Sequence, residues 1–436
     1  MEDVHPLCRR SISDPTLIDL EAGAPGLHLL PATALAAATT RVLIPNYENR
    51  NVDDGDSSAA TAAAFDPFTS PLCMLYGALR GPLSLRRALS DYLNGELAAC
   101  SGYERCSAEE LCVTNGCSQS LDLLCARLCR PGDVVLAERI TYFLCQSIFE
   151  DHGVRVVPVE VGADGIDVAD LEAKMKAHRP RMLYMIPVYQ NPTGATVPHA
   201  ARQAIVALAR RHSCAVVSDE VCELLWFDPG RLPPAPMACY DDRAPDWPGV
   251  VSVWSLSKLV CPGLRLGFLH SRRPALLDAC SSAGYVVSGG GLNPVLAAAV
   301  REMLLSGDLA QHVRALRGSL AGAASELSAA LAQQFGADVE VRAPGGGFFL
   351  WAALRGRAGE ALGSARDKVL AALAAEGVAV KRGDLCLLRE EAATAKGAEV
   401  AAETAKAMRL CLAYCPRSRM SEGVARIRKA LGTLGY

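Results

Sequence analysis

The middle of the chain alternates short apolar runs with amphipathic helical patterns. Four runs are typical of strands buried on both faces, at residues 133–137, 155–159, 181–186 and 214–218. Residues 198–212 have the spacing of a helix, and a further apolar run follows at residues 250–254. Buried strands that alternate with helices predict an α/β fold with a mostly parallel sheet. In such sheets, ligands bind beyond the carboxyl ends of the strands.

The last third of the chain has a different pattern. A long helix is predicted at residues 308–335, and three short strands are predicted around residues 339–341, 348–351 and 408–412. We therefore expect a smaller α+β domain there. The expected division is an N-terminal segment at residues 1–75, a large α/β domain at 76–305 and the small domain at 306–436. Two insertions are predicted, a surface loop at 46–71 and an exposed helical excursion at 389–406.

Composition and charge narrow the class of protein. The chain has 436 residues, a net charge of −3 and 50% hydrophobic residues, enough for a large core in two domains. This charge gives no reason to expect nucleic acid or a membrane as a partner. No apolar run reaches the roughly 18 residues that span a bilayer, and the acidic start resembles no targeting peptide, so we expect a cytoplasmic protein. The 17 cysteines include no C-x-x-C pair, so we expect reduced, buried cysteines and no metal site.

A lysine follows the apolar run at residues 250–254. Lys258 lies between Ser255 and Arg265, which could hold an anion such as a phosphate. A lysine at a buried strand end, near other positive charge, loses its proton more readily and can form a Schiff base. An aldehyde for the lysine and a phosphate for its neighbours suggest pyridoxal phosphate (PLP). The alternative is a solvated loop with scattered charge, and this segment alone does not separate the two.

Four other segments carry candidate chemistry, and each has an ordinary structural alternative. Gly116 precedes a helical pattern whose free N–H groups could bind an anion, although a plain helix cap looks similar. Asn191, in Asn-Pro-Thr-Gly, could bond a ring hydroxyl or form a turn. Asp219 at a strand end could pair with a protonated pyridine nitrogen, or act as a helix cap or in an ion pair. Arg409 inside an apolar strand needs an anion, from a protein carboxylate or a substrate.

In this order, the segments resemble the fold-type I PLP-dependent aminotransferases of class I/II, over nearly the whole chain from about residue 18. Three motifs carry the resemblance: YMIPVYQNPTG at residues 184–194, SDEV at 218–221 and SLSKLVCPGLR at 255–265. The resemblance implies a large domain with a mostly parallel seven-stranded sheet and a smaller α+β domain. The chain is similar to the branch that includes 2-aminoadipate, kynurenine and broad aromatic aminotransferases.

The resemblance also implies roles for single residues. Lys258 would be the Schiff-base lysine and proton shuttle, and Asp219 would hold the pyridine nitrogen. Asn191 would bond the ring 3-oxygen and adjoin the substrate, whose α-carboxylate Arg409 would clamp with the Gly23 backbone. The other cofactor contacts would come from Gly116, Cys117, Ser118, Tyr142, Cys222, Ser255 and Arg265.

Two further positions affect the implied function. Tyr76 matches a tyrosine that reaches the phosphate of a neighbouring subunit, which implies a homodimer. Cys222 stands where the family usually has a tyrosine, and a thiol is a weaker hydrogen-bond donor. The implied reaction moves an amino group between an L-amino acid (2-aminoadipate, aromatic or broad range) and a 2-oxo acid. The same residues would serve a C–S β-lyase, and a non-catalytic PLP-binding sensor is a remote alternative.

Overall fold

A computed structural model of the protein describes residues 14–43, 71–389 and 395–436. The loop predicted at residues 46–71 therefore lies, except for its last position, outside the described residues. Helix α13 (Ala395–Thr404) occupies the segment predicted as a helical excursion. Across the three described ranges, no helix combines the length and the apolar character needed to cross a membrane.

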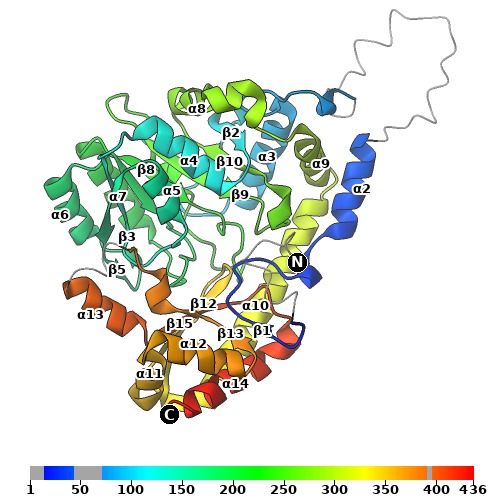
Figure 1. Ribbon diagram of the computed structural model, residues 1–436. Coiled ribbons are helices and arrows are strands. Elements are labelled where there is room, and N and C mark those ends of the chain that lie inside the picture. Colours follow the sequence, from blue (N-terminus) through cyan, green and yellow to red (C-terminus); the bar gives the residue numbers. More distant parts are fainter. Residues whose placement is uncertain (1–13, 44–70, 390–394) are drawn as a thin grey trace, which may run out of the picture.

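A seven-stranded sheet forms the centre of the larger part of the molecule (Figure 1). Its strands lie in the order β2 (Leu111–Thr114), β10 (Gly267–His270), β9 (Val250–Ser255), β8 (Ala215–Asp219), β7 (Met182–Met185), β3 (Val134–Glu138) and β4 (Arg155–Val159). Neighbouring strands are parallel except at β10, which runs antiparallel to both β2 and β9. The prediction of an α/β fold with a mostly parallel sheet is confirmed.

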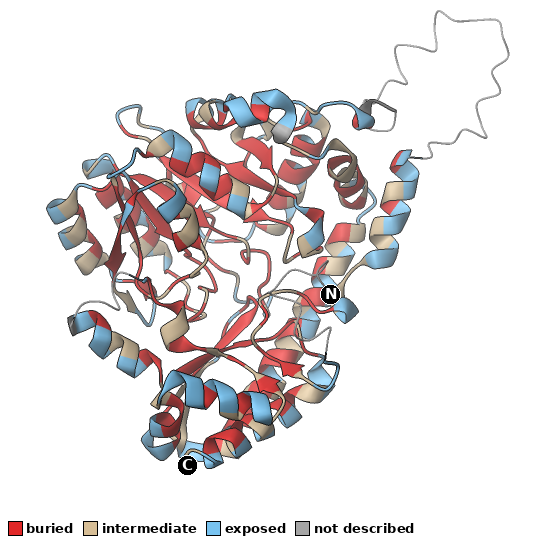
Figure 2. Cartoon of the chain, in the orientation of Figure 1, coloured by how far each residue is buried: buried red, intermediate tan, exposed pale blue. Residues whose placement is uncertain are grey.

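Helices cover both faces of this sheet, so its strands are buried except at Arg155, the first residue of β4 (Figure 2). Because successive side chains of a strand point to opposite faces, neighbouring residues enter different cores. Val217 packs in a core with α4 (Cys117–Leu128) and α5 (Cys145–Asp151). Val216 packs in another core with α6 (Val168–His178) and α7 (His199–Arg211). This double burial explains the continuous apolar runs of the sequence.

A second sheet is antiparallel and has four strands, in the order β11 (Val339–Arg342), β12 (Phe349–Leu354), β15 (Ala407–Cys411) and β14 (Lys381–Arg382). Its helices are α11 (Gly356–Gly363), α12 (Arg366–Ala375), α13 and α14 (Met420–Gly432). The sequence predicted three of these strands and missed β14. The domain boundaries at residues 75 and 305 stay predictions.

The N-terminal segment contacts both parts of the chain. Strand β1 (Ile18–Asp19) pairs in parallel with β13 (Val378–Ala379), beside the small sheet. The remaining helices are α2 (Ala32–Leu43), α3 (Leu83–Glu96), α8 (Pro274–Ser281), α9 (Pro294–Leu305) and the 28-residue α10 (Asp308–Phe335). Helix α2 packs against α9, and α10 packs against α14.

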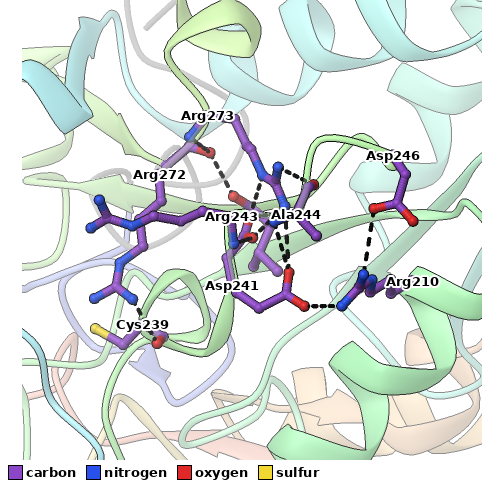
Figure 3. A network of polar contacts seen from close by, with 11 residues as sticks. Arg210, Cys239, Asp241, Arg243, Ala244, Asp246, Arg272 and Arg273 are labelled. Atoms are coloured by element: carbon purple, nitrogen blue, oxygen red, sulfur yellow. Dashed lines mark hydrogen bonds and ion pairs between the residues drawn. The ribbon is translucent and has the colours of Figure 1, made fainter.

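A network of hydrogen bonds and ion pairs lies at the amino ends of the parallel strands (Figure 3). The buried Asp241 carboxylate accepts hydrogen bonds from Arg273 Nε at 2.9 Å and from the Val250 backbone N–H, at the start of β9, at 2.9 Å. Arg210 of α7 forms an ion pair with Asp246 at 3.7 Å. The network lies at the strand edge opposite to the carboxyl ends, so it fixes the sheet without taking part in a site at those ends.

Candidate active site

A cavity of about 580 Å³ lies at the carboxyl ends of the large sheet and is also lined by strands of the small sheet. It brings together most of the predicted site residues, namely Gly23, Cys117, Ser118, Tyr142, Asn191, Asp219, Cys222, Ser255, Lys258, Arg265 and Arg409. Gly116 adjoins it through Arg265, while Tyr76 lies outside the cavity and is 89% exposed. These residues come from strand ends and loops far apart in sequence, so the fold assembles the site.

One end of the cavity is suited to an anion. Gly116 caps the start of α4 with φ +88°, and a Cβ there would lie 3.0 Å from Arg265 Nη2. The Arg265 guanidinium donates to the Asn115 carbonyl oxygen at 3.1 Å, beside the helix start. Free backbone N–H groups at a helix start and a guanidinium both attract negative charge.

Hydroxyl groups surround this end. Ser255 ends β9, and its Oγ donates to Ser257 Oγ at 3.0 Å. Ser118 lies in the first turn of α4 and lines the cavity. Ser257 stands directly before the lysine and was not among the predicted site residues.

A buried carboxylate lies at the end of β8. Asp219 is 8% exposed, and its Oδ2 accepts a hydrogen bond from the Tyr184 hydroxyl at 2.8 Å. Burial raises the pKa of Asp219 to about 6, and the bond from Tyr184 partly opposes that rise. A cationic partner such as a protonated pyridine nitrogen would favour the ionised carboxylate. Tyr184 was quoted in a sequence motif but was given no role.

Lys258 lies in the same cavity. Its amine donates a hydrogen bond to the Gly23 carbonyl oxygen, which fixes the direction of the side chain. Burial lowers the pKa of the Lys258 amine, so the neutral, nucleophilic form is more accessible than in a free lysine. The Nζ atom also lies 5.7 Å from the Phe348 ring centroid.

Arg409 of β15 faces the cavity from the small sheet. Its Nη1 donates to Asn191 Oδ1 at 3.1 Å, and its Nη2 donates to the Glu21 carbonyl oxygen at 2.7 Å. Its buried Nε finds no hydrogen-bond partner among the described residues. The guanidinium stacks over Phe349 at 4.2 Å from the ring centroid. Among the described residues, no carboxylate group forms a hydrogen bond or an ion pair with Arg409. The guanidinium can therefore bind an anionic ligand.

A buried glutamate, Glu138, anchors the loop that carries Asn191 to the large sheet. It was not among the predicted site residues. Glu138 ends β3, and its Oε2 accepts from the Ile186 N–H at 3.0 Å and from Gln190 Nε2 at 3.3 Å. Gln190 Oε1 in turn accepts from the Thr193 N–H at 2.9 Å. These bonds span both sides of the cis Asn191–Pro192 peptide and fix the loop against the sheet.

The sequence profile of the family "aminotransferase class I and II" matches residues 48–427. The chain belongs to this family. It is therefore an aminotransferase that uses pyridoxal 5′-phosphate.

Individual relatives agree with this assignment. The 2-aminoadipate transaminase of Thermus thermophilus is 27% identical over 339 residues, which are 77% of this chain and 75% of the relative. The crystal structure of an α-aminoadipate aminotransferase from Thermus thermophilus, complexed with N-(5′-phosphopyridoxyl)-L-leucine, superposes with a TM-score of 0.77 at 25% identity, over 99% of this chain and 95% of that one.

Regulators also match. An uncharacterized HTH-type transcriptional regulator of Bacillus subtilis is 26% identical over 284 residues. The match covers 64% of this chain but only 55% of the regulator. The similarity therefore involves about half of that relative.

The cavity of this aminotransferase fits its cofactor. The lysine amine suits the aldehyde, the buried carboxylate suits the pyridine nitrogen, and the helix start with Arg265 suits the phosphate. The φ of +88° at Gly116 and the distance of 3.0 Å from its Cβ position to Arg265 Nη2 both favour glycine at the anion end.

Cys222, which stands where the family resemblance predicted a tyrosine, lies in the cavity. It is 6% exposed and lines the cavity. Burial raises the pKa of its thiol to about 12, so the thiol is neutral at physiological pH. Nearby, Cys117 Sγ lies 4.0 Å from Asp219 Oδ1. Both thiols offer only weak hydrogen bonds in the cofactor cavity.

Proposed function

We propose that this aminotransferase uses Lys258 to move the substrate α-proton, Asp219 to hold the cofactor ring and Arg409 to bind the substrate α-carboxylate. The observation that carries this proposal is that one cavity contains all three groups, each with few competing partners. A lysine, a carboxylate and an arginine in such an arrangement provide a base, a counter-charge and a binding clamp.

Each residue has a distinct task. When bound, pyridoxal phosphate withdraws electrons and makes the Cα–H bond of the attached substrate acidic. The neutral Lys258 Nζ would accept the proton from the substrate Cα, hold it as an ammonium group and then give it up again, so it would act first as a base and then as an acid. Asp219 stabilises the protonated pyridine nitrogen, which requires its ionised form. The phosphate end at Arg265 fixes the position of the ring.

Arg409 orients the substrate. A guanidinium holds a carboxylate through two parallel hydrogen bonds, so the binding is directional as well as strong. Asn191 holds Nη1 of Arg409 at 3.1 Å and adjoins the ring position. Fixing the α-carboxylate presents the Cα–H bond to Lys258, which favours proton transfer over other bond cleavages.

The substrate range proposed is an L-amino acid of the 2-aminoadipate, aromatic or broad type, with a 2-oxo acid as acceptor. The name of the Thermus relative supports the first. Rings at Tyr142, Phe143 and Phe349 in the cavity wall support an apolar or aromatic side chain. The transfer of the amino group to an acceptor separates this function from a β-lyase, which releases ammonia.

The active form proposed is a homodimer with shared sites. Tyr76 is 89% exposed, and its neighbours Leu75 and Met74 are each 62% exposed, an apolar surface that suits a second copy. Tyr76 of that copy would reach the phosphate end. A cytoplasmic location completes the proposal, supported by the many buried, unpaired cysteines among the described residues.

Amino-group transfer from L-2-aminoadipate to 2-oxoglutarate tests the proposal. We expect Lys258→Ala to lower the rate by about 10²- to 10⁴-fold, the contribution of a positioned general base. Lys406→Ala, at a 40%-exposed surface lysine side chain, is the matched control and should leave the rate unchanged. Transfer that survives in Lys258→Ala, or release of ammonia without an acceptor, contradicts the proposal.

A further inference from the structure

A second cation lies beside Arg409 in the cavity wall. Lys381 of β14 is directly opposite Arg409 of β15 in the antiparallel register, and both residues line the cavity. Opposite residues of an antiparallel pair project their side chains from the same face, with Cβ atoms about 5 Å apart. The Phe143 ring lies against both, with its centroid 4.8 Å from Lys381 Nζ and 6.0 Å from Arg409 Cζ.

The other charges around the cavity already have tasks. Asp219, Lys258 and Arg265 serve the cofactor in the proposed function. The Asp19 carboxylate accepts the backbone N–H groups of Glu21 and Ala22 at 2.8 and 2.9 Å. Among the cationic residues that line the described cavity, Lys381 is therefore the one left without a task once Arg409 binds the α-carboxylate.

Glu21 is the present partner of Lys381. Its Oε1 lies 2.5 Å from Lys381 Nζ, while its backbone oxygen accepts from Arg409 Nη2 at 2.7 Å. The Glu21 side chain is 29% exposed and the Lys381 side chain 15% exposed. The backbone of Glu21 is thus fixed to the clamp, but its side chain reaches solvent and can leave Lys381. Exchange of the Glu21 carboxylate for another carboxylate would keep one negative charge beside Lys381.

We propose that Lys381 binds the distal carboxylate of dicarboxylic amino and 2-oxo acids, and that Glu21 replaces that carboxylate when the substrate side chain is neutral. The inference rests on the proposed function, in which Arg409 holds the α-carboxylate. Two cations on one face of the sheet then match the two carboxylates of one substrate. Phe143, whose ring lies near both cations, would contact the methylene groups or an apolar side chain. One cavity can thereby accept both substrate classes.

Isosteric substrates test this inference. L-2-Aminoadipate and L-norleucine have the same six-carbon skeleton and differ in the distal carboxylate. We expect Lys381→Met to lower the ratio of kcat/KM for 2-aminoadipate over norleucine by about 10- to 100-fold, the range for a lost hydrogen bond to a charged group. Lys381→Arg should keep most of the ratio. Glu21→Gln should raise it, because the counter-ion is removed.

A ratio measured within one preparation does not depend on how much of the variant folds. Lys406→Met removes a surface lysine that is paired with Glu403 at 2.9 Å, and it should leave the ratio unchanged. An equal loss of both substrates in Lys381→Met overturns the inference but leaves the transaminase proposal standing. Unchanged kcat/KM values for both substrates also overturn the inference.

Binding gives an independent readout. Calorimetry with glutarate and pentanoate, five-carbon acids that differ in one carboxylate, measures the second anion site without turnover. We expect cofactor-loaded wild-type protein to prefer glutarate, and Lys381→Met to lose that preference. If the protein transfers no amino group, the proposed function fails, while glutarate selectivity still decides the role of Lys381. Equal binding of both acids by the wild-type protein overturns the inference.

Discussion

The Tyr184 hydroxyl donates a hydrogen bond of 2.8 Å to the buried Asp219 carboxylate. The bond joins the ends of two neighbouring parallel strands, β7 and β8. It stabilises the ionised carboxylate against the effect of burial, which raises the pKa of Asp219. Tyr184 thus helps Asp219 keep the charge that the cofactor ring nitrogen requires.

Removal of this hydroxyl is therefore expected to weaken the cofactor site. Tyr184→Phe should raise the pKa of Asp219 further and lower the affinity for pyridoxal phosphate about tenfold, since a hydrogen bond to a charged group is worth about 1.5–3 kcal/mol. Cofactor titration between pH 6 and 8 measures the effect, which should be larger at the lower pH. Tyr103→Phe, which removes a bond of 2.8 Å to Asn94 outside the cavity, is the control. Equal affinities of the two variants would refute this role.

Substitution at the phosphate end has a matched control in the same chain. Gly116 and Gly132 have φ values of +88° and +89°, so alanine at either site causes similar backbone strain, about 1–2 kcal/mol. Only at Gly116 would the new Cβ meet Arg265, at 3.0 Å, whereas nothing lies within 4 Å at Gly132. We expect both variants to lose stability and Gly116→Ala alone to lose cofactor affinity, by about tenfold or more. Similar cofactor affinities of the two variants in a titration would show that the contact between residue 116 and Arg265 does not affect cofactor binding.

The buried Glu138 should make the cofactor-free protein less stable as pH rises. Burial raises the pKa of Glu138 to about 8, from an ordinary value of 4.5. Between these values the folded state binds more protons than the unfolded state, so the free energy of unfolding falls as pH increases. Glu138→Gln is expected to reduce this slope between pH 5 and 8.

Denaturant unfolding at several pH values measures the slope. Glu340→Gln replaces a glutamate whose side chain is 67% exposed, and it should leave the slope as in the wild type. A Glu138→Gln variant with the wild-type slope would contradict the expected titration. Asp219 also has a raised pKa, about 6, so part of the slope should persist in Glu138→Gln.

The sequence predicted the sheet and most of the cavity because both follow from local signals. Apolar runs marked the buried strands, and Asp219, Ser255 and Lys258 stand at or just after strand ends, which parallel strands bring to one edge. Contacts between distant segments gave no such signal. The bond from Tyr184 to Asp219 spans 35 positions in sequence, and Glu138 looks like the ordinary polar end of a strand.

Three of the strands that were not predicted are short and have a weak pattern. β2 and β10 have four residues each, and β14 consists only of Lys381 and Arg382. A four-residue run is too short to show a period, and two charged residues show no apolar pattern at all. The place of Lys381 in the cavity wall was therefore not predicted, although its strand neighbour Arg409 was. The roles of single residues, Tyr76 in particular, stay predictions.

Lys258 is expected to hold the cofactor covalently through its amine. Borohydride reduction of the cofactor-loaded protein, followed by peptide mass spectrometry, fixes pyridoxal phosphate to the lysine that carries it. We expect one modified peptide, with the added mass on Lys258, and none when the sample is first saturated with an amino acid substrate. Modification of another lysine, or no modification at all, would contradict the account.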